Sequence, residues 1–155
     1  MPDGLYDRDI VVWSEQQADL LRRLAAGERV NADVDWVNLI DEVADVGRSE
    51  LNACESLLGQ ALVHLLKLQA FATHEAARHW RRETIVFLNS ARRRFTPSMK
   101  SRIDLAGLHR DAVDAVRAAH PEVAFRCAEA SPFTLDELIG RTGPVAYLLG
   151  DRGGD

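Results

Sequence analysis

The chain has 155 residues, a formal net charge of −5 at pH 7 and 46% hydrophobic residues. A chain of this length suits one domain and can bury a sizeable core, so we expect a folded protein rather than a disordered segment. The negative charge gives no general attraction to nucleic acid or to acidic membranes. No apolar run reaches the roughly 18 residues that a membrane-spanning helix needs, so we expect no membrane span.

The cysteine content and the N-terminus indicate a cytoplasmic protein. Cys54 and Cys127 are too few for a disulfide framework, and their spacing matches no zinc motif. Two reduced thiols are typical of a reducing compartment. The stretch "MPDGLYDRDIVVW" places acids before a short apolar run and does not match a secretory signal peptide.

The first half of the chain predicts two helices. Apolar residues at helical spacing predict the first over residues 7–26. A long helix follows, with Asp33 or Asp35 as its N-cap. Its apolar positions alternate steps of three and four residues, the spacing of a stripe that faces a helical bundle. We expect burial of this stripe, which comprises Trp36, Ile40, Val43, Gly47, Leu51, Cys54, Leu58, Ala61, Leu65 and Leu68.

The second half predicts helices and no strand, because no segment alternates apolar and polar residues over a β-branched run. A third helix covers about residues 75–94. The segment "FTPS" predicts a fourth, with Thr96 as its cap and Pro97 in its first turn, ending before Pro121. The motif "TLDE" is a capping box that opens a short helix near the C-terminus.

Two adjacent acids, Asp41 and Glu42, interrupt the apolar stretch 37–50. At 100° per residue, Asp41 falls on the side of the long helix away from the apolar stripe, where we expect solvent. Glu42 falls near the edge of the apolar arc and could lean toward a neighbouring helix. Adjacent helical residues diverge, so this pair is not a preformed two-carboxylate catalyst.

Two further titratable residues, Glu50 and His64, fall inside the apolar arc. A lone buried carboxylate is costly, so Glu50 should have a cationic partner or be protonated. We expect both residues to be structural. The alternative is that they line a functional cavity, where Glu42, Glu50 and His64 are the candidate catalytic residues.

Five segments in this order resemble a bacterial family known as domain of unknown function 29. They are "YDRDIVVWSEQQADLL" from Tyr6, "NLIDEVADVGRSE" from Asn38, "ALVHLLKLQ" from Ala61, "WRRETI" from Trp80 and "SPFTLDELI" from Ser131. The resemblance covers about residues 5–140 and implies a helical bundle without an established activity. The family's recurring positions correspond to Tyr6, Asp7, Asp9, Trp13, Asp41, Glu42, Gly47, His64, Lys67, Trp80 and Thr84. The chain departs from the family at Ala44, where a third acid is common, and at His79, where a small polar residue is common.

A metal site is one hypothesis. The motifs "DEVAD" (Asp41, Glu42, Asp45) and "DAVD" (Asp111, Asp114) are similar to the two magnesium-binding helices of MazG-type nucleotide pyrophosphohydrolases. Magnesium needs oxygen ligands directed into one cavity, whereas two of these acids are predicted to point away from the stripe. We therefore expect no metal and no other cofactor. A metal-assisted hydrolase that uses Glu42 and His64, with Asp41 in support, remains the enzymatic alternative.

The arginines suggest another hypothesis. Residues 78–102 contain eight basic residues against one acid, whereas residues 28–55 contain eight acids against two arginines. A basic strip can contact phosphates, with Arg81, Arg82, Arg92, Arg93 and Arg94 as candidates. Alternatively, acidic and basic helices of one bundle, or of two subunits, lie beside each other. The negative net charge favours this second explanation, so nucleic-acid binding is the third hypothesis.

The sequence thus predicts an all-α protein, a bundle of four to five helices with one long amphipathic helix. We expect a single domain over residues 1–155, with a core at about 5–140 and a flexible tail at 150–155. No catalytic motif is recognisable, so an enzyme is not the leading hypothesis. That hypothesis is a cytoplasmic protein-interaction or scaffold module that binds another protein and self-associates. Trp13, Trp36 and Trp80 are candidate anchors, although tryptophans more often pack in a core.

Overall fold

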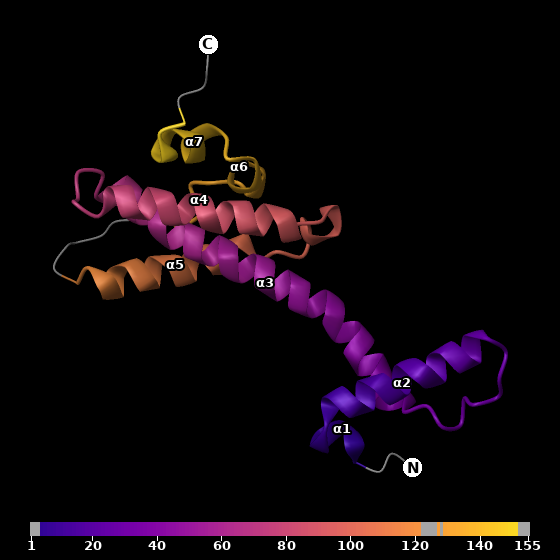
Figure 1. Cartoon of the computed structure of the whole chain (residues 1–155). Helices are drawn as coiled ribbons and strands as arrows, with labels where there is room; N and C mark the ends of the chain where they lie inside the picture. The colour runs from indigo at the N-terminus through magenta and orange to yellow at the C-terminus, as the bar shows by residue number, and fades with distance from the viewer. Residues whose placement is uncertain (1–3, 122–126, 128, 152–155) are drawn as a thin grey trace. The chain divides into compact units, whose positions relative to one another are not determined.

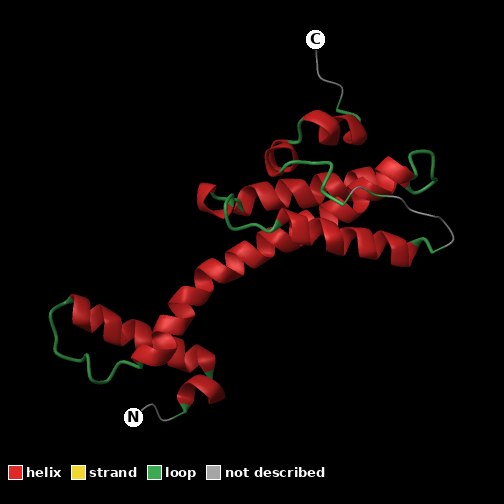
Figure 2. Cartoon of the chain, turned by 180° about the vertical axis from the view of Figure 1, so that it is seen from behind, coloured by secondary structure: helices red, strands yellow, loops and turns green. Residues whose placement is uncertain are grey.

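The structure is a computed structural model that describes residues 4–121, 127 and 129–151. The described residues form seven α-helices, one short 3-10 helix and no strand (Figure 1, Figure 2). The predicted all-α class and the predicted long helix are confirmed. None of the described helices combines the length and the apolar character needed to cross a membrane. Most of the tail predicted to be flexible, residues 152–155, lies outside the described residues.

The helices follow one another through short connections. They are α1 (Leu5–Arg8), α2 (Ile10–Ala25), α3 (Trp36–Ala70), α4 (Ala77–Arg94), the 3-10 helix η1 (Pro97–Met99), α5 (Leu105–Ala119), α6 (Leu135–Gly140) and α7 (Gly143–Leu149). The helix predicted over residues 7–26 is interrupted at Asp9, whose backbone leaves the helical region. The Asp9 carboxylate instead caps α2, because it accepts a hydrogen bond from the Val12 amide at 3.1 Å.

The contacts between residues divide the chain into two compact units. Unit 1 is residues 1–48 and contains α1, α2 and the start of α3; unit 2 is residues 49–155 and contains the remaining elements. The boundary therefore falls inside α3. The single-domain organisation stays a prediction.

Unit 2 contains the main hydrophobic core. Its part of α3 buries Leu58, Leu62 and Leu65 completely. The Cys54 thiol lies 3.7 Å from the Ala91 carbonyl oxygen of α4. Figure 1 shows α6 and α7 against α4, and residues from these short helices complete the core. The inner positions predicted for α4 are buried, and they are Trp80, Thr84, Leu88 and Ala91.

The apolar stripe of α3 is buried only along its second half. From position 54 to position 68 its members are buried, as predicted. In contrast, Trp36 is 44% exposed, Ile40 63% and Val43 67%. The prediction that the whole stripe is buried was therefore wrong, because no described residue covers these three side chains.

The predicted fourth helix begins later than expected. Pro97 opens only the 3-10 turn, and the Thr96 side chain makes no capping hydrogen bond. The helix α5 begins at Leu105, because the Asp104 carboxylate accepts a hydrogen bond from the Gly107 amide at 3.0 Å. It ends at residue 119, before the proline that was expected to stop it.

The capping box at the start of α6 is confirmed. The Glu137 amide donates to the Thr134 hydroxyl at 3.2 Å, and the Thr134 amide donates to the Glu137 carboxylate at 2.8 Å. The same carboxylate lies 3.0 Å from where a side chain at Gly143 would begin, and the φ angle there is +56°. Glycine at this position therefore allows α7 to follow α6 closely.

The core predicts a clear difference between two apolar residues. Leu65→Ala should lower the free energy of unfolding by about 2–5 kcal/mol, because it leaves a cavity among fully buried neighbours. Val86→Ala is the matched control, because Val86 is 52% exposed on α4, and it should change stability by less than about 0.5 kcal/mol. Urea unfolding followed by circular dichroism measures both. Equal stability of the two variants would contradict this core.

Candidate functional site

Glu42 makes the central polar contact of unit 1. It is half-buried on α3 and accepts a hydrogen bond from the Tyr6 hydroxyl of α1 at 2.5 Å. The prediction that Glu42 leans toward a neighbouring helix is confirmed, and Asp41 is exposed as predicted. The hydrogen bond to Glu42 raises the pKa of Tyr6 to about 12, and desolvation and the negative charge of Glu42 add to this effect. The contact ties α1 to α3.

A second polar cluster joins α2 to the start of α3. Asp35 is the N-cap of α3, because its carboxylate accepts from the Asn38 amide at 3.5 Å and from the Asn38 side chain at 2.7 Å. It also accepts from the indole of Trp13 at 3.1 Å, and its own amide donates to the Gln17 side chain at 2.9 Å. The hydrogen bonds from Asn38 are the main reason that the pKa of Asp35 is lowered. Trp13 and Gln17 are both buried.

These clusters carry structural contacts rather than a recognisable catalytic arrangement. A hollow of about 550 Å³ lies beside them, lined by parts of α2 and by residues 32–37. The Tyr6 ring packs edge-on against Trp13, with 4.9 Å between ring centroids. Each of these carboxylates therefore serves as an acceptor that orients a helix.

His64 lies in unit 2 at the contact between α3 and α4. Its ring stacks on Phe87 with 5.7 Å between centroids, and its Nδ1 atom is buried without a hydrogen-bond partner among the described residues. Burial lowers the pKa of His64, and the nearby charge of Lys67 adds to the effect. The imidazole is therefore neutral at pH 7. Lys67 in turn lies 5.5 Å above the ring of Trp80, which is a cation–π distance.

Glu50 is paired but not buried. Arg94 donates to both of its carboxylate oxygens, at 3.0 and 3.1 Å, so the predicted cationic partner is confirmed. The predicted burial was wrong, since 51% of the Glu50 side chain is exposed. The physical reason is that α4 ends at Arg94 and covers this part of α3 only with its last turn. An exposed pair of this kind contributes about 0–1 kcal/mol to stability.

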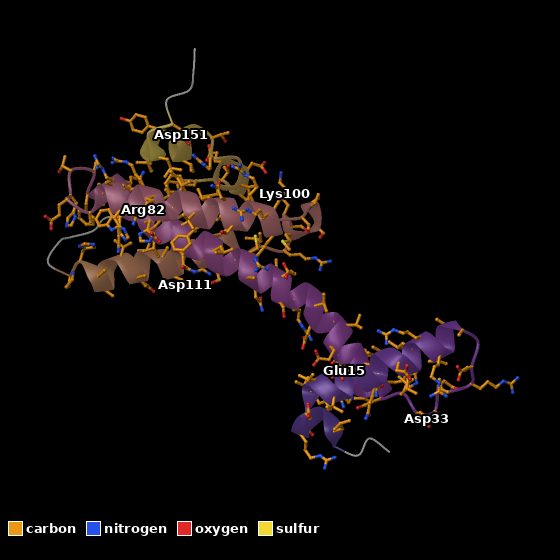
Figure 3. All side chains as sticks on the ribbon, in the orientation of Figure 1. Glu15, Asp33, Arg82, Lys100, Asp111 and Asp151 are labelled. Atoms are coloured by element: carbon orange, nitrogen blue, oxygen red, sulfur yellow. The ribbon has the colours of Figure 1, made fainter. Side chains whose placement is uncertain are left out.

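The acids proposed for a metal site do not gather around one position. Asp41 and Asp45 are exposed in unit 1, and Asp45 accepts from the Arg48 side chain at 2.7 Å. Asp111 and Asp114 are exposed on α5 in unit 2, and Figure 3 labels the first of them. In the part of the chain that the structure describes, no three His, Cys, Asp or Glu side chains could hold one metal ion.

Two arginines of the predicted basic strip bind backbone carbonyls within unit 2. Arg81 donates to the Leu148 carbonyl at 3.1 Å, at the end of α7, and Arg92 donates to the Ile139 carbonyl at 2.7 Å, at the end of α6. The last carbonyls of a helix lack partners within the helix, and a cation there also interacts favourably with its dipole. Sequence reasoning missed this role. The only signal was the shortness of the C-terminal helices, whose ends need donors.

Other basic residues show a mixture of paired and exposed positions. Lys100, labelled in Figure 3, pairs with Asp136 of α6 at 2.9 Å. Arg82 lies 4.0 Å from Glu83 and is mostly exposed, and Arg93 is exposed as well. The strip 78–102 therefore serves in large part to hold unit 2 together.

Comparisons with known proteins agree with this fold. A family model described as "Domain of unknown function DUF29" matches residues 5–142. Among solved structures, the chain is similar to an α-helical protein of unknown function from Rhodospirillum rubrum, whose crystal structure has a resolution of 1.45 Å. The two share 30% identity over 96% of this chain and 98% of that chain, with a TM-score of 0.70. No curated protein matches. The resemblance inferred from the five segments is confirmed.

The contact between Tyr6 and Glu42 predicts an alkaline titration. In a Tyr147→Phe variant, where Tyr6 is the remaining tyrosine, phenolate absorbance should rise with a midpoint near pH 12. Because the folded-state pKa exceeds the ordinary value of about 10, the contact stabilises the fold fully below pH 10 and is lost as pH rises toward 12. Adding Glu42→Gln should return the midpoint toward about 10. A midpoint that does not move would contradict the contact.

The carbonyl contacts of the arginines predict a local effect. Arg92→Met removes the donor but keeps the apolar stem, so it should speed amide hydrogen exchange in α6 and lower stability by about 1 kcal/mol. Arg93→Met, at an exposed neighbouring position, is the control and should leave α6 unchanged. The same exchange rates in both variants would show that Arg92 does not hold α6.

Proposed function

The chain belongs to the DUF29 family, to which no activity is assigned, and we propose that it is a cytoplasmic protein-interaction or scaffold module that docks through an apolar face of unit 1. We call this surface the α3 face. Its members are Trp36 (44% exposed), Val37 (73%), Ile40 (63%), Val43 (67%) and Val46 (68%). Exposed apolar patches of this kind mark interaction surfaces in folded proteins.

The polar contacts of unit 1 support this proposal. Tyr6 and Trp13 approach α3 at Glu42 and Asp35. At 3.6 residues per turn, both acceptors lie more than about 90° around the helix from Ile40. The helices α1 and α2 are thus held away from the α3 face. The Trp36 indole donates to the Asn31 carbonyl at 2.9 Å, which orients its ring while much of it stays in water.

The free energy available from docking is substantial. Complete burial of one such side chain contributes about 1.5–3 kcal/mol, and these residues are roughly two-thirds exposed. Five of them could therefore supply several kcal/mol, of which part offsets the entropy lost on association. Among the side chains of unit 1, these contribute the most apolar surface to a partner.

The cytoplasmic part of the proposal rests on the thiols. Cys54 and Cys127 are both free. Burial raises the pKa of the Cys54 thiol, which makes it an unreactive packing group. Free thiols of this kind are typical of a reducing compartment.

The two alternative functions gain no specific support from the contacts. Glu42 serves as an acceptor for Tyr6, and His64 is stacked on Phe87. Arg81 and Arg92 bind the ends of short helices. We therefore keep one proposed function.

Site-specific photocrosslinking tests this function. A benzophenone side chain at position 43 should give a covalent adduct of one defined larger mass in the native host cell, because this position lies on the α3 face. The same probe at position 86, similarly exposed on α4, is the control and should give none. Absence of an adduct specific to position 43 would refute the proposed docking surface.

A further inference from the structure

We propose that the partner on the α3 face is a second copy of this chain, paired through an antiparallel contact between the two α3 segments from Trp36 to Gly47. This inference rests on the proposed function, because it names the occupant of the same surface. It specifies which residues meet and how strongly.

The apolar pattern of the segment reads the same in both directions. In "WVNLIDEVADVG", residues 36–47, two apolar residues, one polar, two apolar and two polar are followed by two apolar, one polar and two apolar or small residues. The centre lies between Asp41 and Glu42. A two-fold contact between antiparallel helices places each residue opposite its mirror position, so such a contact matches apolar positions with apolar positions throughout.

The same register also matches large residues with small ones. Trp36 lies opposite Gly47 of the second copy, and Ile40 lies opposite Val43. At 100° per residue these four positions fall within about 60° of one another on the helix, which makes them the centre of the contact. Val37 and Val46 extend the surface on its two flanks.

Gly47 provides the most specific observation. Glycine is among the poorest helix formers, and this one lies inside α3. A side chain added at Gly47 would meet nothing within 4 Å, so no described contact of its own chain requires a glycine. A tryptophan ring from a second copy does require one, because only glycine leaves the backbone open to a ring of that size.

The available area sets the expected strength. A fully buried aliphatic side chain hides on the order of 60–120 Å², so the five exposed side chains supply roughly 600–1,000 Å² over two copies. Specific interfaces usually bury at least about 1,200 Å². The pair is therefore at the lower limit, and we expect a dissociation constant in the micromolar range rather than an obligate dimer.

The charge of unit 1 predicts how the contact responds to salt. Residues 1–48 carry eleven acids and five arginines, a formal net charge of −6. Asp41, Glu42 and Asp45 lie about 100° or more around α3 from Ile40, so they flank the contact without entering it. Two acidic units repel each other through solvent, and salt screens this repulsion. Salt should therefore strengthen self-association, whereas it would weaken the binding of a basic partner.

Sedimentation equilibrium of the full chain over roughly 1–100 µM tests the inference. We expect a reversible monomer–dimer equilibrium that tightens at higher sodium chloride. Val43→Asp should weaken it at least about 100-fold, because a charge enters the centre of the contact. Val86→Asp, an exposed valine outside the α3 face, should leave it unchanged.

Gly47→Leu separates this pairing from general stickiness. The substitution adds apolar area and favours the helix, so it should preserve or raise the melting temperature. It should nevertheless weaken the dimer at least about tenfold, because the new side chain occupies the place of Trp36 from the other copy. Unchanged or tighter self-association in this variant would overturn the proposed register.

The outcomes distinguish this inference from the proposed function. A strict monomer at every concentration, together with a position 43 adduct whose added mass is not that of the chain, overturns self-pairing and keeps the docking surface. A strict monomer without any such adduct overturns both. A dimer that survives Val43→Asp refutes self-pairing through this surface.

Discussion

Burial of the apolar stripe of α3 is the interaction on which the rest of the structure depends. In unit 2 this stripe lies beneath α4 and α5, and residues such as Leu58 and Leu65 are completely removed from water. The stripe continues along the same helix into unit 1, where its side chains are mostly exposed. A helix can extend beyond its core because its backbone hydrogen bonds are internal. Its apolar side chains have no such internal solution, and their exposure is the physical motive for association.

The polar residues of unit 1 account for where that exposure occurs. Tyr6 and Trp13 belong to short helical segments that could have covered the stripe, but their hydrogen bonds are directed to Glu42 and Asp35 on other sides of α3. Each acceptor is a carboxylate, which makes these contacts stronger than bonds between neutral groups. The acidic pair that interrupts the apolar sequence is thus divided in its roles. Glu42 holds a helix in place, and Asp41 stays in solvent.

The sequence could predict what depends on local rules. Helical periodicity predicted the long helix, and the capping box from Thr134 to Glu137 predicted the start of α6, because both signals act within a few residues. The start of α5 was misplaced because Asp104 competes with Thr96 as a cap, and only the fold decides between them. Periodicity identified an apolar stripe but could not say what covers it. The predicted burial of Ile40 and of Glu50 failed for this reason.

The arginines show the same distinction for the candidate site. Their number in residues 78–102 indicated a charged surface, yet Arg81 and Arg92 bind carbonyls about 50 or more residues away in sequence. Contacts at such separation depend on tertiary structure and leave no local pattern. Glu42 was better predicted, because its position at the edge of the stripe follows from the helical angle alone.

The most direct test of self-pairing is an isotope-filtered nuclear Overhauser experiment on an equal mixture of labelled and unlabelled chains. Antiparallel pairing predicts magnetisation transfer between the Trp36 ring of one copy and the α-protons of Gly47 in the other. Transfer between the two Trp36 rings, or no transfer between copies at concentrations well above the dissociation constant, would contradict it.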